Sequence, residues 1–256
     1  MRAHNTLSKV TMQTAILLKF QTGNAKLVKV ITTFSLPAGY SCPAALDCLS
    51  RADRASGQIT DGRLTEYRCF AASDEAKSPN ARNARWHNFD ILRNLDMWAI
   101  VNKLQASIPN KAKIVRIHVS GDFYNSKYFN AWMIVARMNP HIHFYAYTKS
   151  VNYWVDYVNA GYKIPLNINL TASFGGRHDN LIKQYNLKSA FVVYHPDHAK
   201  RMGLEIDHDD SLAMYGKESF ALLLHGTQPA KSEASEAISK MRKENIKFSY
   251  SKQGAK

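Results

Sequence analysis

The chain has 256 residues and a mass of 28.9 kDa, a size that suits one sizeable domain. Hydrophobic residues make up 45% of the sequence and charged residues 21%, which excludes a wholly disordered or low-complexity chain. Thirty-four Lys and Arg against twenty Asp and Glu give a formal net charge of +14, which favours nucleic acid or a nucleotide-bearing substrate as partner.

Membrane and export signals are missing from the sequence pattern. No apolar run approaches the roughly 18 to 20 residues that span a bilayer, and the first residues lack a signal-peptide pattern. We therefore expect a cytoplasmic protein with no membrane partner, whose oligomeric state the sequence leaves open. In a reducing compartment, three cysteines favour metal binding or reactivity over a disulfide framework.

Hydrophobic periodicity divides the chain into alternating strands and helices. Residues 1–26 are expected to form a basic N-terminal arm or edge element, residues 27–246 an α/β catalytic-type domain and residues 247–256 a basic tail. Strands are expected at residues 27–36, 113–123, 141–150, 165–173, 189–196 and 219–226. Helices are expected at residues 88–107, 151–161, 179–185 and 233–243, and from a cap at Asn125 or Ser126 to Asn139. Residues 40–85 are expected to form a long loop, which carries the cysteines.

Strands that alternate with helices indicate βαβ units. The predicted fold class is α/β, with a mostly parallel sheet of about six strands, a partial (β/α) barrel in a single domain with a Cys-bearing loop. Ligands of such folds bind beyond the carboxyl ends of the strands, where crossover loops and helix N-termini meet.

The carboxyl ends of the predicted strands carry chemically capable side chains. Asp122, Lys149 and His225 directly follow apolar stretches, where neighbours can shift a pKa, so they are the candidate catalytic residues. The candidate cofactor contacts at the same edge are Ser120, Gly121, Asp122, Ser173 and Gln228.

The cysteines Cys42, Cys48 and Cys69 have the spacing C-x5-C-x20-C. Three thiolates leave one position open on a metal centre, as a catalytic cluster needs, whereas a fourth ligand such as His87 or Asp47 would close a structural zinc site. Buried thiols without a metal are a further interpretation, because free cysteine is often buried. The spacing alone leaves these three readings open.

The segments LPAGYSCPAALDC, YRCFAAS, RIHVSGDF, FYAYTKS and HGTQP together resemble the phage family called gene product eighty-eight, over roughly residues 34–234. This resemblance implies a phage-encoded protein of the host cytoplasm and no particular activity. More distantly, the layout is similar to radical S-adenosylmethionine enzymes, with a cysteine-bearing loop after the first strand and a Gly-Gly-Glu-like turn after the second.

The second resemblance implies a [4Fe-4S] cluster held by Cys42, Cys48 and Cys69, with S-adenosylmethionine on its open iron. It implies that residues 120–122 hold the amino group of the methionine moiety. The basic surface would fit nucleic acid or a nucleotide-like molecule as substrate. The chain departs from the C-x3-C-x2-C spacing usual in those enzymes.

Two other functions remain open. His141 and His143 fit the His-x-His pattern of rolling-circle replication initiators, in which two histidines bind a divalent cation that polarises the scissile phosphate. Tyr185 would then be the nucleophile, and Lys188 would steer the phosphate. A non-catalytic, zinc-stabilised nucleic-acid-binding protein is the third candidate. The acidic stretch 207–210 could bind a divalent cation but is more typical of a solvated loop.

Overall fold

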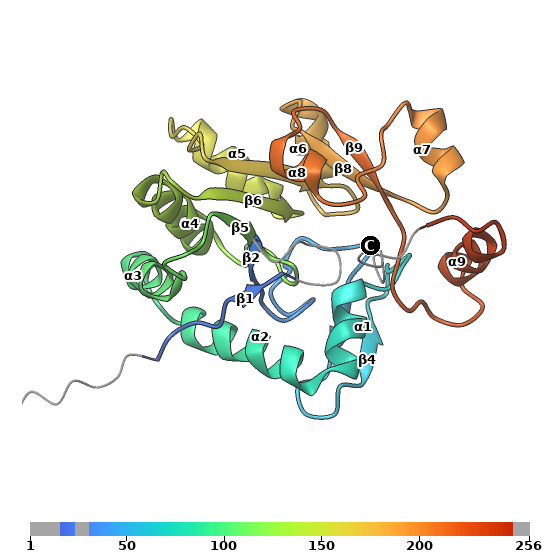
Figure 1. Cartoon of the computed structure of the whole chain (residues 1–256), viewed down its shortest axis with the longest axis horizontal. Coiled ribbons are helices and arrows are strands. Elements are labelled where there is room, and N and C mark those ends of the chain that lie inside the picture. The colour runs from blue at the N-terminus through green and yellow to red at the C-terminus, as the bar shows by residue number, and fades with distance from the viewer. Residues whose placement is uncertain (1–15, 24–30, 248–256) are drawn as a thin grey trace, which may run out of the picture.

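The computed structural model describes residues 16–23 and 31–247, and in this part the chain forms one large sheet flanked by helices (Figure 1). The large sheet has seven strands in the order β1-β2-β5-β6-β7-β8-β9, and every neighbouring pair except β1 and β2 is parallel. The strands are β1 (Gln21–Thr22), β2 (Ile31–Phe34), β5 (Ile114–Ile117), β6 (His143–Thr148), β7 (Ile168–Ser173), β8 (Ser189–Val193) and β9 (Phe220–Leu223). The predicted α/β class with a mostly parallel sheet is confirmed.

The parallel strands follow one another in chain order, without a reversal. This is the order found in a (β/α) barrel, and β1 and β9 are the edge strands of the described sheet. Because strands β2, β5, β6, β7, β8 and β9 are parallel, their carboxyl ends share one edge, and the loops that leave them can converge.

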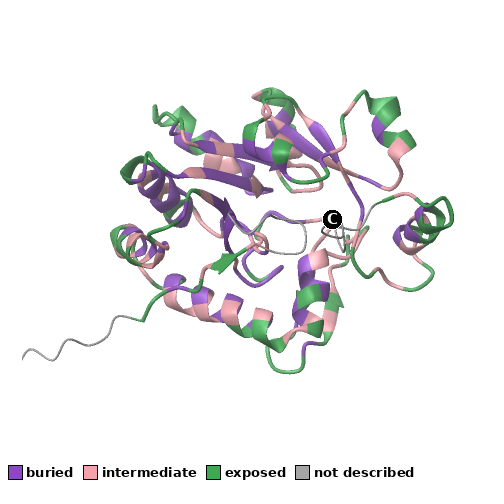
Figure 2. Cartoon of the chain, viewed as in Figure 1, coloured by how far each residue is buried: buried purple, intermediate pink, exposed green. Residues whose placement is uncertain are grey.

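Helices α3 (Met97–Ser107) and α4 (Ser126–Met138) pack on the outer face of the sheet, whereas α8 (Ser211–Tyr215) lies against β6 and β7 on the inner face (Figure 1). Trp132 from α4 contacts Phe34 of β2 and Phe144 of β6, with ring centroids 5.6 and 6.2 Å apart. Figure 2 shows that β6 and most of α4 are buried. The helices are α1 (Phe70–Lys77), α2 (Pro79–Leu92), α3 (Met97–Ser107), α4 (Ser126–Met138), α5 (Val151–Asn159), α6 (Asp179–Gln184), α7 (Pro196–Met202), α8 (Ser211–Tyr215) and α9 (Glu233–Lys243).

The inner face of the sheet carries polar and aromatic side chains. Arg116 of β5 forms an ion pair with Asp210, which also accepts hydrogen bonds from the hydroxyls of Tyr145 and Tyr147 at 3.1 and 3.4 Å. Asp210 is fully buried and Asp207 is 1% exposed. The expectation of a solvated acidic loop is therefore wrong for these two residues. The arginine and the two tyrosines hold Asp210 inside, and the amides of Asp209 and Ala213 bond to the Asp207 carboxylate, whereas His208 and Asp209 are exposed.

The predicted loop 40–85 and the predicted helix 88–107 differ from the structure. A small hairpin of β3 (Ser50–Ala52) and β4 (Ile59–Asp61) precedes α1, and α2 begins within the expected loop. The Ser78 hydroxyl caps α2, and Pro79 occupies its first turn. The Asp96 carboxylate then caps α3 through the amide of Ala99 at 2.9 Å, so two helices replace the single one expected.

Other boundaries agree closely with the expectation. Asn125 caps α4 through the amide of Tyr128 at 2.9 Å, and α9 matches the predicted range. Of the expected N-terminal arm, residues 1–15 and 24–26 lie outside the described residues, as do residues 27–30 of the first predicted strand and 248–256 of the tail. Within the part of the chain that is described, no helix has the length and apolarity needed to cross a bilayer.

Candidate functional site

The segment that follows β2 carries Cys42 and is held against the turn after β5. The amide of Leu36 donates to the carbonyl of Ser120 at 2.9 Å. The hydroxyl of Ser41 donates to the carbonyl of Pro37 at 2.8 Å, and the amide of Gly39 donates to the Cys42 sulfur at 3.3 Å. A backbone amide directed at the sulfur stabilises its thiolate form, which is the form that binds metals.

Cys48 is positioned by the loop that follows β7. The amides of Leu46 and Asp47 donate to the carbonyl of Gly175 at 3.2 and 3.1 Å, and the amide of Arg177 donates to the carbonyl of Ala44 at 2.8 Å. Gly175 has φ +90°, and a Cβ on it would lie 2.6 Å from Oδ2 of Asp47. This close approach requires glycine and places the cysteine-bearing loop, residues 42–48, over the carboxyl end of β7.

Cys69 follows the β3–β4 hairpin in the chain, and hydrogen bonds hold its segment against the loop that carries Cys48. The amides of Glu66 and Tyr67 donate to the carbonyl of Asp47 at 2.8 and 3.1 Å, and the amide of Cys69 donates to Ser50 Oγ at 3.3 Å. Cys69 is the N-cap residue of α1, so its sulfur lies at the positive end of a helix dipole.

The three thiols lie within electrostatic reach of one another. Burial raises the pKa of Cys42 well above its usual value, and the charges of Asp122, Cys69 and Cys48 raise it further. Burial also raises the pKa of Cys48, and it raises the pKa of Cys69 to about 12 with a further contribution from Cys48. Across the described residues, no three His, Cys, Asp or Glu side chains are grouped closely enough to hold a single metal ion.

Asp122 lies beside this thiol cluster and organises the neighbouring strand end. One of its carboxylate oxygens accepts from the Phe123 amide and the Thr148 hydroxyl at 2.7 and 2.6 Å, and the other from the amides of Lys149 and Ser150 at 2.8 and 3.3 Å. Burial raises the pKa of Asp122 to about 6, although these hydrogen bonds oppose the shift. Asp122 thus ties the end of β5 to the end of β6.

Lys149 and Ser173 meet at the same edge. The Lys149 ammonium donates to Ser173 Oγ at 3.1 Å and to the carbonyl of Phe174. Its charge lowers the pKa of Cys48 and of Asp47 against the raising effect of burial. The cation therefore lies where it would partly compensate the charge of thiolates.

His225 and Gln228 follow β9 and contact the segment around Cys69. The His225 ring packs against the Phe70 ring in a tilted arrangement, with centroids 4.8 Å apart. The Gln228 side-chain amide accepts from the Arg68 amide at 2.7 Å and donates to the Arg68 carbonyl at 3.1 Å. Gln228 therefore binds backbone next to a cysteine. The residues expected at this edge of the sheet therefore contact the segments that carry the three cysteines. We call this edge the mouth; it comprises Ser120, Gly121, Asp122, Lys149, Ser173, His225 and Gln228.

Sequence reasoning missed Glu75, a fully buried carboxyl on α1. Its Oε1 accepts from the Ala38 amide at 2.8 Å, from the Ser120 hydroxyl at 3.1 Å and from Arg85 at 3.0 Å. Burial raises its pKa, and the positive charge of Arg85 opposes this. Glu75 joins the helix after Cys69, the turn before Cys42 and the turn before Asp122. The six-residue spacing from Cys69 gives no signal of this role.

Gly121 makes the turn between these segments possible, because its φ is +86° and a Cβ would lie 2.5 Å from Ser41 Oγ and 2.7 Å from Leu36 Cβ. We expect Gly121→Ala to lower the free energy of unfolding by about 3 kcal/mol, the sum of backbone strain and overpacking. Gly161 is the matched control, since its φ is +85° but no atom lies within 4 Å of the added Cβ. Urea denaturation should show a loss of only about 1 to 2 kcal/mol for Gly161→Ala; equal losses would contradict the crowding at Gly121.

His118 should make the fold sensitive to acid. It is 3% exposed, its Nε2 lies 3.0 Å from the Tyr128 hydroxyl, and burial lowers its pKa to about 3. Below its unfolded pKa of about 6.5 the unfolded chain binds a proton that the folded chain does not, so stability is lost as pH falls. From pH 7 to pH 5 the loss due to His118 should be about 2 kcal/mol. Urea titrations of wild type and His118→Asn should differ by this amount; parallel pH profiles would contradict it.

The residues of the expected nuclease site lie away from the three thiols. His143 opens β6, at the opposite end of the sheet from the mouth, and its Nε2 is 2.8 Å from the carbonyl of Met214. Lys188 donates to the carbonyl of Leu212 at 2.7 Å, and Tyr185 accepts from Asn159 at 2.8 Å. His141 is exposed. His143 and Lys188 thus bond to the last carbonyls of α8.

The fold and the site define an α/β protein with three thiols beside the carboxyl ends of its parallel strands. The family model described as Gene product 88 matches residues 8–243, so the chain belongs to that family. It is 30% identical to the Gene 88 protein of Mycobacterium phage L5 over 138 residues, which are 50% of this chain and 51% of that protein. It is 28% identical to the Gene 88 protein of Mycobacterium phage D29 over 138 residues, 50% of each chain. The chain thus spans about half the length of these curated relatives, and no solved structure matches it.

Proposed function

We propose that the protein is an iron–sulfur enzyme of the radical S-adenosylmethionine type that acts on nucleic acid or a nucleotide-like substrate. One observation carries this proposal. The β3–β4 hairpin separates Cys69 from Cys42 and Cys48 in the chain, yet the amides of residues 66 and 67 bond to the Asp47 carbonyl and the three thiols lie within electrostatic reach of one another.

The chemistry of the donor set suits a cluster. Each thiolate of a [4Fe-4S] cluster binds a different iron, and three cysteines leave one iron open. A structural zinc site takes four protein ligands, so the three thiols are one ligand short of it.

When bound, the reduced cluster supplies one electron for cleavage of the sulfonium bond of S-adenosylmethionine. The chain's own residues would prepare this site. Cys42, Cys48 and Cys69 would hold the irons, and the Lys149 ammonium would offset part of the negative charge of the thiolates. The Gly39 amide at the Cys42 sulfur would tune the cluster potential, as hydrogen bonds to cluster ligands do.

Asp122 would act as a positioning residue. Both of its oxygens already accept hydrogen bonds, from Phe123, Thr148, Lys149 and Ser150. Because Asp122 directly follows Gly121, these bonds would hold the Gly121 turn in place. The Gly121 carbonyl would then face the amino group of the cofactor, with Ser173 and His225 along the same edge, while the buried Ser120 hydroxyl holds Glu75. The His225 imidazole, whose Nδ1 lies 3.1 Å from the Leu223 carbonyl, would be the group that transfers a proton.

The proposal is tested by reductive cleavage of S-adenosylmethionine. Protein purified without air, loaded with iron and sulfide and reduced with dithionite should release 5′-deoxyadenosine and methionine in equal amounts. Omission of dithionite is the control, because the cleavage consumes one electron. Absence of both products from an iron-loaded, reduced sample would contradict the proposal.

A further inference from the structure

We infer that the surface formed by α2 and the β3–β4 hairpin binds single-stranded nucleic acid, with a base on Tyr40 and phosphates beside Arg54. This α2 surface consists of Tyr40, Arg51, Arg54, Trp86 and the hollow next to them. The inference rests on the part of the proposed function that names nucleic acid as substrate, and it is independent of the cluster.

Two arginines flank a pair of aromatic rings on this surface. The Arg51 guanidinium lies 5.4 Å from the centroid of the Tyr40 ring, Tyr40 and Trp86 have centroids 4.8 Å apart, and the Arg54 guanidinium lies 4.8 Å from the Trp86 ring. Tyr40 is 38% exposed and Trp86 only 7%, so Tyr40 is the ring that a base can reach. Proteins stack unpaired bases on exposed rings of this kind beside guanidinium groups.

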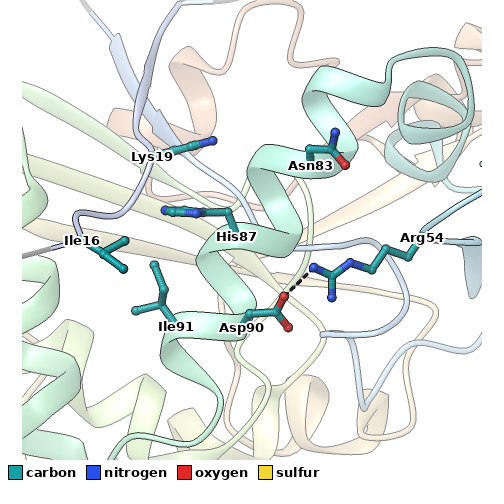
Figure 3. A pocket seen from close by; sticks show the side chains of 7 residues that line it. All are labelled: Ile16, Lys19, Arg54, Asn83, His87, Asp90 and Ile91. Carbon is teal, nitrogen blue, oxygen red and sulfur yellow. Dashed lines mark ion pairs between the residues drawn. The ribbon is translucent and has the colours of Figure 1, made fainter.

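The hollow beside Arg54 has a volume of about 470 Å³. Figure 3 shows Asn83, His87 and Asp90 on α2, with Lys19 to one side of the helix and Arg54 to the other. The apolar wall of the hollow comes from Ile16 and Ile91. The volume is within the range of about 300 to 1,000 Å³ that holds small molecules, so one nucleotide unit fits.

The charges in the hollow suit a phosphate. Its one carboxylate, Asp90, is 2.7 Å from Arg54 and 3.2 Å from Arg93, so two guanidinium groups compensate a single negative charge. Lys19 adds a further cation, and Asn83 adds an amide donor. The hollow thus has a net positive charge, as the whole chain does with its formal net charge of +14, and positive charge attracts the phosphates of nucleic acid.

The α2 surface adjoins the mouth through the chain itself. Arg51 Nε donates to the Gly39 carbonyl at 3.3 Å, and the Gly39 amide donates to the Cys42 sulfur. Tyr40 follows Gly39 directly. A strand bound across α2 with a base on Tyr40 would therefore lie next to the thiol loop. Single strands suit this surface better than duplexes, because bases in a duplex are already stacked.

Fluorescence anisotropy with a labelled oligothymidylate of about twelve nucleotides tests the inference, with oligouridylate as a second probe to compare DNA and RNA. Wild-type protein is used without cofactor, together with Tyr40→Leu, Arg54→Gln and the matched charge control Arg201→Gln. Arg201 is exposed and lies on α7, far from α2 in Figure 1.

Tyr40→Leu should weaken binding about tenfold through the lost base stacking. Arg54→Gln should weaken it several-fold and lower the salt dependence by about 0.7. Arg201→Gln should change the affinity less than about twofold. The inference is overturned if Tyr40→Leu and Arg54→Gln bind like wild type, or if Arg201→Gln weakens binding as much as Arg54→Gln.

The two proposals can fail separately. A protein that binds single strands through Tyr40 and Arg54 but releases no 5′-deoxyadenosine contradicts only the cluster chemistry. A protein that cleaves S-adenosylmethionine while its affinity for single strands is insensitive to both substitutions contradicts only the α2 surface.

Discussion

Replacement of Cys42, Cys48 or Cys69 by serine, one at a time, should reduce iron retention and release of 5′-deoxyadenosine to background. A serine hydroxyl is a hard, weakly acidic ligand, whereas iron–sulfur clusters select soft thiolates. Each sulfur would hold a different iron, so no remaining cysteine can replace the lost one. Iron content per chain, the visible spectrum and product release measure the effect.

The three cysteine variants control for one another. If the thiols only fill buried space, serine should lower stability modestly, and each variant should keep the metal content of the wild type. If one cysteine were outside the site, its variant alone would retain iron. Three variants that retain iron and product release at wild-type levels would contradict the proposed roles of these residues.

Glu75→Ala should lower the free energy of unfolding by about 3 to 5 kcal/mol. The substitution removes the buried partner of Arg85, whose side chain is 9% exposed, and leaves the Ala38 amide and Ser120 hydroxyl without their acceptor. Chemical denaturation at neutral pH measures the loss. Because Glu75 joins the turns before Cys42 and Asp122, the variant should also retain less iron per folded chain.

Asp74→Asn is the matched control for Glu75→Ala. Asp74 pairs with the same arginine at 2.6 Å, but its side chain is 51% exposed. Water screens such a pair, so its loss should cost at most about 1 kcal/mol. Similar losses for the two variants would show that burial at Glu75 does not carry the effect.

Elements with a clear hydrophobic period were predictable from the sequence. Helix α4, with Asn125 as its cap, and α9 combine apolar periodicity with a start signal, and the strand ends at Thr148 and Ser173 follow apolar runs. Helix α1 and most of α2 were not predicted, because charged residues occupy some of their buried positions and interrupt the apolar periodicity. These residues are Glu75, Arg82 and Arg85. The Ser78-Pro79 pair was the available start signal.

The mouth was predictable in outline but not in its contacts. Parallel strands bring their carboxyl ends to one edge, which placed Asp122 and Lys149 together. Cys69 is held near the other two cysteines by hydrogen bonds between distant segments. Gln228 bonds to Arg68, 160 positions away, and the amides of residues 66 and 67 donate to the Asp47 carbonyl. Such long-range pairings follow from tertiary packing, which no local pattern encodes.

Metal and sulfide analysis of the wild-type protein, purified without air, tests the central claim most directly. The account predicts a brown protein that absorbs near about 400 nm and contains about four iron and four sulfide per chain. A colourless protein that retains about one zinc per chain would contradict it.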